Sequence, residues 1–277
     1  MKYYYPQHIK GYARIKAEGK VAWGEIHGVE GFENFSTRSF LEAVLPTLQF
    51  DTLQPEVFNY GCGTGPDACY LAERGFRVDA IDLIPDAIEI AKQQAALRHL
   101  DIYYAVQDIC EVTPGGKQYD AVLDSFCLQC IVFDEERQKV FSTVHTRLKP
   151  NGYFLVASAV MDAEHLAMVR EEETLTDSAT GVVYIRYGDG GKSLLDRKSG
   201  IVLVPIDDNE ISGPHMQDVY NFPDAVQING KWFLPHRRHI TRELLENELQ
   251  QAGFRVIYRD ASQEGCLACV KSGHKER

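Results

Sequence analysis

Closely spaced glycines are the feature of this sequence that most restricts its fold. The stretch VFNYGCGTGPDACYLAERGFRVDAIDL, residues 57–83, contains Gly61, Gly63 and Gly65. Residues 56–60 form an apolar run of strand length, and residues 67–74 form a helix-sized segment closed by a glycine. The three glycines are therefore expected in a turn that leads from a strand into a helix.

The same alternation continues after this turn. Residues 76–82 read as a second apolar strand, and Pro85 opens a second helix over residues 86–98. Strands that alternate with helices of this length predict a parallel sheet, whose ligand lies outside the carboxyl ends of the strands.

The chemistry of the turn favours a nucleotide-like ligand. Glycines allow positive φ and a close approach, and the free N–H groups of a helix start favour a polar or anionic group. The spacing here is G-x-G-x-G, whereas the dinucleotide pattern is G-x-G-x-x-G. Asp82 ends the second strand, where a carboxylate can bind both hydroxyls of a ribose. A ribose is therefore expected, and a pyrophosphate is not required.

The segment VFNYGCGTG...AIDLIPDAIEIAK resembles the cofactor-binding segment of class I methyltransferases that use S-adenosylmethionine. Four later segments are similar to that family in the same order: QDIC at 107–110, YDAVLDSFCLQC at 119–130, RLKPNGYFLVA at 147–157, and the final helix and strand pair at 244–272. Together the matches extend over roughly 160 residues. The resemblance implies an α/β fold with a Rossmann-like, doubly wound seven-stranded sheet. That sheet is mostly parallel with an antiparallel last strand, and it carries a small added α+β lid.

The resemblance also implies the cofactor, its product S-adenosylhomocysteine, and a set of contacts. Asp82 would bind the ribose, Asp108 would lie near the adenine amino group, and the end of the fourth strand would pass the methionine portion. The implied cofactor-binding residues are Asn59, Gly61, Gly63, Gly65, Asp82, Leu83, Asp108, Ile109, Asp124, Ser125 and Phe126. The glycines would make room for the methionine end.

One position departs from the family pattern. The family usually has Asp or Glu two residues before the first glycine, and this chain has Asn59. An amide still donates and accepts hydrogen bonds but carries no charge toward the sulfonium. We therefore expect weaker cofactor binding, not its absence.

The length of the chain predicts two additions to the core. We expect an N-terminal helical cap at 1–50, the cofactor-binding core at 51–160, an insertion at 161–240, and the closing helix and β-hairpin at 241–277. The cap is rich in aromatic residues, and residues 36–45 read as a helix with Ser36 as N-cap. It is expected to cover the sheet and to place Tyr4, Tyr5, Trp23 or His27 near the acceptor.

The insertion reads as a small antiparallel layer. Asn229-Gly230 between two β-like runs indicates a hairpin. The layer would recognise the substrate or form the interface of a homodimer. In its PHRRH segment, extended backbone would place His236 with Arg238 on one face and Arg237 with His239 on the other. The two arginines either bind a carboxylate or phosphate of the acceptor or offset nearby acids.

Methyl transfer from a sulfonium is an in-line displacement in which the enzyme mainly aligns the reactants and excludes water. A base is needed only when the acceptor must lose a proton, and the sequence does not single one out. The candidate catalytic residues are His27, His236 and Tyr5. The candidate substrate-binding residues are Tyr4, Trp23, His215, Arg237 and Arg238, with His215 also considered as a base.

Charge and composition limit the classes of partner. A net charge of −11 and a pI near 5.3 argue against nucleic acid as acceptor. The absence of a leader-like start and of long apolar runs predicts a cytoplasmic protein with no membrane partner. Two CxxC pairs lie in or beside expected strands, where residues three apart point to opposite faces, so no metal is expected. We expect a small, acidic or aromatic organic acceptor.

Three alternatives stay open at this point. A nicotinamide-dependent oxidoreductase would share the glycine turn, but the early third glycine counts against it. A non-catalytic cofactor-binding protein is compatible with Asn59. A methyltransferase of arsenite or tellurite is suggested only by the thiols.

Overall fold

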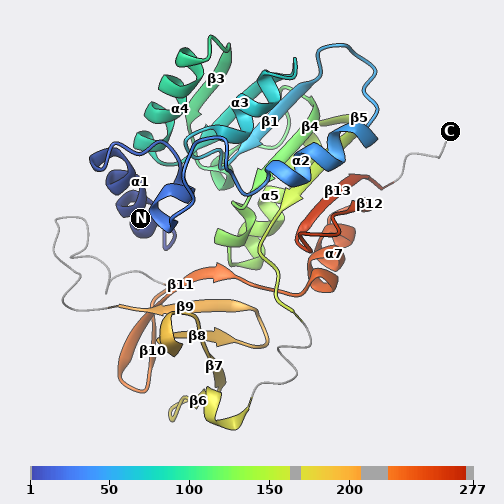
Figure 1. The fold of residues 1–277 in the computed structure, drawn as a ribbon. Coiled ribbons are helices and arrows are strands. Elements are labelled where there is room, and N and C mark those ends of the chain that lie inside the picture. Colours follow the sequence, from blue (N-terminus) through green and yellow to red (C-terminus); the bar gives the residue numbers. More distant parts are fainter. Residues whose placement is uncertain (1, 163–169, 207–223, 273–277) are drawn as a thin grey trace. The chain divides into compact units, whose positions relative to one another are not determined.

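The computed structural model describes residues 2–162, 170–206 and 224–272 (Figure 1). They divide into two compact units, one of residues 9–128, 133–158 and 242–277 and one of residues 1–8, 129–132 and 159–241. We call the first the core unit and the second the sheet unit. No helix in the described ranges combines the length and apolarity needed to cross a bilayer.

The core unit contains the predicted seven-stranded sheet (Figure 1). Its strands are β1 (Glu56–Tyr60), β2 (Arg77–Asp82), β3 (Ile102–Val106), β4 (Tyr119–Ser125), β5 (Leu148–Ala157), β12 (Phe254–Arg259) and β13 (Cys266–Lys271). Their order is β12-β13-β5-β4-β1-β2-β3, and only β13 runs antiparallel to its neighbours. This arrangement confirms the fold class predicted from the sequence.

Helices surround this sheet because the strands are apolar on both faces. They are α1 (Tyr5–Ala17), α2 (Arg38–Val44), α3 (Pro66–Ala72), α4 (Pro85–Leu97), α5 (Asp134–Arg147) and α7 (Arg242–Gln251), with short 3₁₀ turns at Trp23–His27, Leu45–Thr47, Ile109–Glu111 and Leu128–Cys130. The cap helix begins at Arg38 after Thr37, so the predicted N-cap Ser36 is wrong. Its inward residues Phe40, Leu41 and Val44 are buried as expected.

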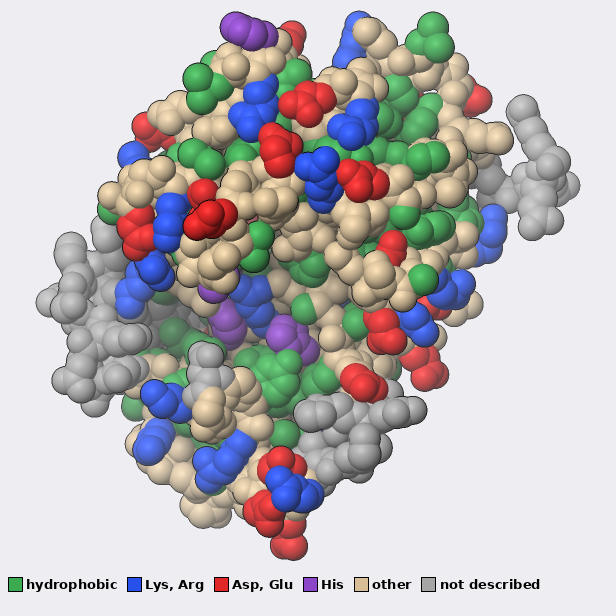
Figure 2. Space-filling model, viewed as in Figure 1, with side chains coloured by type: hydrophobic (Ala, Val, Ile, Leu, Met, Phe, Trp, Pro, Cys, Tyr) green, Lys and Arg blue, Asp and Glu red, His purple; other side chains and the backbone are tan. Residues whose placement is uncertain are grey.

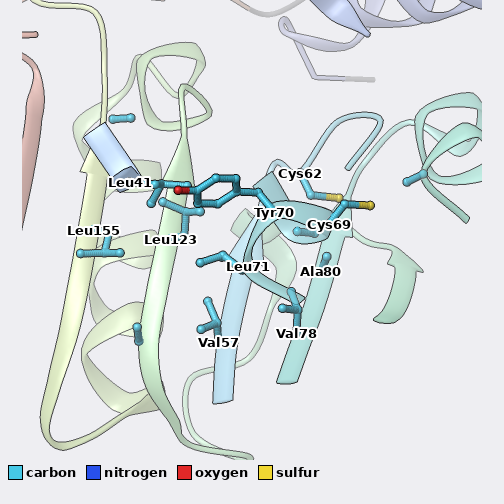
Figure 3. Packing of buried hydrophobic residues seen from close by; sticks show 14 of the residues in the cluster. Leu41, Val57, Cys62, Cys69, Tyr70, Leu71, Val78, Ala80, Leu123 and Leu155 are labelled. Carbon is cyan, nitrogen blue, oxygen red and sulfur yellow. The ribbon is translucent and has the colours of Figure 1, made fainter. Parts of the chain in front are cut away.

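The alternation of side chains in β1 divides the core into two layers. Val57 belongs to a buried cluster with residues of α2, α3 and α4, including Leu41, Tyr70 and Leu71 (Figure 3). Phe58 and Tyr60 point to the other face, where the Tyr60 ring packs on Phe154. Phe154 in turn contacts Phe254, which packs on His145 of α5. Each face of the sheet is thus covered, as a doubly wound fold requires.

The sheet unit carries a six-stranded antiparallel sheet with the order β10-β11-β9-β8-β7-β6. Its strands are β6 (Thr174–Thr176), β7 (Val183–Tyr187), β8 (Ser193–Asp196), β9 (Ile201–Pro205), β10 (Val226–Ile228) and β11 (Lys231–Arg238), and a 3₁₀ turn lies at Glu171–Glu173 and another at Asp189–Gly191. Asn229 and Gly230 both have positive φ, 47° and 78°, and join β10 to β11. This confirms the predicted hairpin, because a two-residue turn of this kind requires positive φ at both positions.

The alternation predicted for PHRRH is interrupted in the structure. The pairing of β11 with β9 shifts register between Pro235 and Arg237. Pro235 cannot donate to the ladder, so this internal strand bulges there. The bulge brings His236 beside Arg237, whose Nε donates to His236 Nε2 at 3.2 Å. The prediction that these neighbours face opposite ways is therefore wrong.

Candidate cofactor site and its methyltransferase domain

The glycine turn lies between β1 and α3, at the carboxyl end of the central strand. Gly61, Gly63 and Gly65 have φ values of 62°, 57° and 85°. L side chains rarely adopt this region, which explains why glycine stands at all three positions. The turn is tied to the next strand by the Cys62 N–H, which donates to the Ile81 carbonyl at 3.0 Å.

The space beside each glycine is filled by the protein itself. A Cβ at Gly61 would lie 2.3 Å from Cys127 Cβ, and one at Gly63 would lie 2.7 Å from Tyr12 Oη. A Cβ at Gly65 would lie 2.5 Å from Tyr104 Oη. These contacts give each glycine a packing reason, and the expectation that the turn also makes room for the cofactor stays a prediction. Tyr12, Cys127 and Tyr104 are neighbours of the turn that the sequence analysis missed.

Asp82 links the glycine turn to the loop after β2. One carboxylate oxygen accepts from the Gly63 N–H and the other from the Ile84 N–H, each at 2.9 Å. The side chain is 7% exposed, and the neighbouring Leu83 is half-buried. Because both oxygens already accept backbone hydrogen bonds, the carboxylate is held in one orientation at the sheet edge.

Asp108 follows β3 at the same edge. Its carboxylate accepts from the Cys110 N–H at 2.9 Å and caps the 3₁₀ turn that begins at Ile109. Ile109 is buried. The parallel order β4-β1-β2-β3 places the carboxyl ends of these strands, and so Asp82 and Asp108, along one edge.

The end of β4 completes this edge. Phe126 has a φ of 59°, which is a strained conformation for a bulky residue. It is held there by its N–H, which donates to the Ala157 carbonyl at 2.8 Å. Strain of this kind concentrates at functional sites, where the surrounding structure imposes it.

Asn59 is oriented by hydrogen bonds toward β4. Its Nδ2 donates to the Leu123 carbonyl at 3.3 Å and to Ser125 Oγ at 3.2 Å. Its Oδ1 is buried and bonds to no other described residue. A buried acceptor without a donor is costly unless a ligand or water supplies one. The amide oxygen is thus available to a hydrogen-bond donor from outside the described residues.

We expect Asn59→Asp to destabilise the fold, although the family usually has an acid here. The substitution removes both donors and places a carboxylate oxygen against the Leu123 carbonyl, at a cost of about 3 kcal/mol. Urea unfolding would measure the loss, with the exposed Asp101→Asn as the control. Wild-type stability in the aspartate variant would contradict this role of the amide.

Asp124 is a buried carboxyl whose titration is expected to couple folding to pH. It is fully buried, its Oδ1 accepts from Cys127 and Leu128 N–H groups, and burial raises its pKa to about 7. Burial likewise raises the pKa of Asp67 to about 6, although Thr37 donates to that carboxyl. A folded-state pKa above the unfolded one means that the unfolded chain releases the proton first as the pH rises.

We therefore expect the free energy of unfolding to fall as the pH rises from about 4 to about 7. Asp124 should account for a loss on the order of 3 kcal/mol. Asn at position 124 keeps the accepting oxygen and removes the titration. Asp124→Asn should flatten the profile measured by urea unfolding at pH 5 and pH 8, whereas Asp101→Asn should leave it unchanged. An equally steep profile in Asp124→Asn would rule out this carboxyl as the source.

The predicted catalytic and substrate residues lie in both units. The core unit holds Trp23, whose ring packs 6.0 Å from that of the exposed His27. The sheet unit holds Tyr4 and Tyr5, whose rings stack at 5.9 Å, together with His236 and Arg237. Arg238, also in the sheet unit, donates from Nη1 to the Val132 carbonyl at 3.0 Å. His215 lies outside the described residues.

Comparison with known proteins identifies the core unit. Residues 57–152 match the family described as "Methyltransferase domain". The chain carries a class I S-adenosylmethionine-dependent methyltransferase domain. This confirms the family and the cofactor inferred from the sequence.

The methyltransferase domain is shared with curated proteins over part of their length. The chain is 33% identical over 118 residues to a ubiquinone biosynthesis O-methyltransferase of Rickettsia conorii, a match covering 43% of this chain and 39% of that protein. It is 30% identical over 159 residues to the putative methyltransferase YqeM of Bacillus subtilis, covering 56% and 60%. The chain thus spans less than two thirds of these relatives.

A solved structure shows the same fold over nearly the whole chain. It is the 1,6-didemethyltoxoflavin-N1-methyltransferase of Burkholderia thailandensis, with a TM-score of 0.51 and 15% identity. The match covers 97% of this chain and 91% of that one. At this identity the likeness extends to the fold alone.

The residues of the methyltransferase domain fit S-adenosylmethionine. The cofactor has a ribose with two hydroxyl groups and a methionine portion with an ammonium group. Asp82 lies at the end of β2 as a fixed acceptor for the hydroxyls. The buried Asn59 Oδ1 has the chemistry to accept from the ammonium.

Proposed function

We propose that this protein transfers the methyl group of S-adenosylmethionine to a small organic acceptor that is acidic or aromatic. The observation that carries the proposal is the carboxyl edge of β1, β2 and β4, where Asp82 fixes the glycine turn and the Asn59 oxygen has no partner among the described residues. A site with these groups binds a ribose and an ammonium group at neighbouring strand ends.

The cofactor supplies an activated methyl group, and the residues of this chain bind and orient the reactants. Asp82 and Asp108 would hold the nucleoside portion, and the strained turn at Phe126 would border the methionine portion. The residues of the chain would then exclude water and align the acceptor. This alignment supplies most of the rate enhancement for such a transfer. No metal ligand is needed for this chemistry.

Two observations support a small molecule as acceptor. The Burkholderia thailandensis structure contains the small molecule 1,6-didemethyltoxoflavin together with S-adenosylhomocysteine. In addition, Lys and Arg side chains are interspersed with Asp and Glu over the viewed surface, and no extended basic stripe is visible on it (Figure 2). A nucleic-acid substrate favours a basic stripe.

Calorimetry with S-adenosylhomocysteine, followed by a turnover screen, tests the proposal. We expect micromolar binding, no binding of a nicotinamide dinucleotide, and transfer of a labelled methyl group to at least one small acid or phenol. Binding without turnover across such a panel would favour a non-catalytic cofactor-binding protein. No binding by the folded protein would overturn the proposal.

A further inference from the structure

One face of the six-stranded sheet carries a row of apolar residues that ends in an arginine. Ile185 of β7 pairs with Leu195 of β8, Leu195 with Val202 of β9, and Val202 with Arg237 of β11. The first three pack with Met161 in one buried cluster, and Tyr187 packs against it. Since residues paired across strands share a face, Arg237 continues this apolar row.

Arg237 has no acidic partner in the described parts of the chain. Its only hydrogen bond there is the one from Nε to His236 Nε2. Burial lowers the pKa of His236 to about 3, so this imidazole is neutral and its Nε2 can accept. The contact fixes the plane of the guanidinium and leaves its two terminal nitrogens as donors.

His239 lies two residues further along the chain, and Tyr187 of β7 orients its ring. Its Nδ1 and Tyr187 Oη are 2.9 Å apart, while its Nε2 is buried and has no partner among the described residues. Burial and the nearby Arg237 lower the pKa of His239 to about 4, so this ring is also neutral. When Tyr187 donates to Nδ1, the proton of the ring lies on Nε2, which becomes a third donor.

We propose that Arg237 and His239 form a binding site for the carboxylate of a small organic acid. The guanidinium nitrogens match a carboxylate bidentately, and the His239 Nε2–H adds a donor beside them. The buried apolar row beside Arg237 lowers the local polarity, which strengthens the attraction between the guanidinium and an anion. No carboxylate of the described residues pairs with these donors, so an anion stabilises the site more than a neutral molecule does.

Binding of benzoate tests the site without a turnover assay. The full chain, saturated with S-adenosylhomocysteine and labelled at histidine ¹³Cε1, is titrated with benzoate, and benzamide serves as the neutral control. We expect the His239 resonance, assigned with His239→Gln, to shift saturably with benzoate and not with benzamide. The resonance of the exposed His27 in the core unit should stay in place. No benzoate-dependent shift at His239 would overturn the proposal.

A matched pair of arginine variants separates binding from folding. Arg237→Gln should weaken benzoate binding at least 10-fold without changing S-adenosylhomocysteine affinity. Arg186→Gln removes an exposed arginine from β7 of the same sheet and should change neither constant. Equal benzoate affinity in both variants would remove Arg237 from the site. Failure of the wild-type chain to bind S-adenosylhomocysteine would count against the proposed function instead.

Discussion

Replacement of Asp82 by alanine should abolish cofactor binding. The carboxylate accepts from Gly63 and Ile84 N–H groups and is nearly inaccessible to water. Its removal deletes the proposed ribose acceptor and also leaves two buried N–H groups without their carboxylate partner, each at a cost of about 1–3 kcal/mol. The glycine turn and the loop after β2 then lose their common anchor. We expect S-adenosylhomocysteine affinity to fall at least 100-fold in calorimetry.

Two further variants show whether the loss comes from the carboxylate. Asp82→Asn keeps one accepting oxygen and should bind more weakly than wild type but more tightly than Asp82→Ala. Asp101→Asn changes an exposed acid just before β3 and should bind normally. Affinity within a few-fold of wild type in a folded Asp82→Ala protein would show that this carboxylate does not bind the cofactor.

Elements with a strong local signal were predicted well from the sequence. β1 was placed at residues 56–60 because an apolar run meets a glycine turn, and the structure has the same bounds. The Asn229-Gly230 hairpin followed from the need for positive φ at both positions. The departures are local as well: α3 ends at Ala72, two residues before the predicted end, and α2 begins at Arg38.

The contacts around the glycines could not be predicted because they depend on tertiary structure. Tyr12 reaches Gly63 from a helix 51 positions earlier, and no periodicity in the sequence connects the two. Cys127 was interpreted only through its CxxC spacing, yet it packs on Gly61. The glycine pattern indicated that some group approaches the backbone of the turn closely. It did not identify that group.

The site in the sheet unit was predicted in part. The PHRRH segment singled out Arg237, and its spacing to His239 indicated a shared face. The bulge at Pro235 changed the neighbours of His236, since a proline inside a strand interrupts the ladder. Tyr187, which orients His239, comes from a strand 52 positions earlier, so the sequence alone gave no signal for it.

Gly61→Ala should destabilise the protein more than replacement of any glycine that has open space beside it. Positive φ costs an L residue about 1–2 kcal/mol, and the new Cβ would also lie 2.3 Å from Cys127 Cβ and 2.7 Å from its Sγ. The Cys127 Sγ can rotate away, but its Cβ is bonded directly to the backbone, so the backbone must move. We expect a loss of about 3 kcal/mol of unfolding free energy once this overpacking is included.

The control is Gly75→Ala in the same unit. Gly75 has a φ of 86°, and a Cβ there would meet nothing within 4 Å. Its substitution should therefore lower the free energy of unfolding only by the cost of positive φ, about 1 kcal/mol. Equal losses for the two variants in urea unfolding would mean that φ alone, and not contact with Cys127, requires glycine at position 61.

A double-mutant cycle isolates the contact itself. Cys127→Gly removes both clashing atoms, and the remaining Cα lies 3.5 Å from the new Cβ, an ordinary contact distance. Gly61→Ala should therefore cost less in the Cys127→Gly background than in wild type, with an interaction energy of about 1–2 kcal/mol. Strict additivity would show that the turn relaxes away from Cys127 at no cost. A positive interaction energy would show that the glycine turn is shaped by the end of β4, and so by the residues that we propose border the methionine portion of the cofactor.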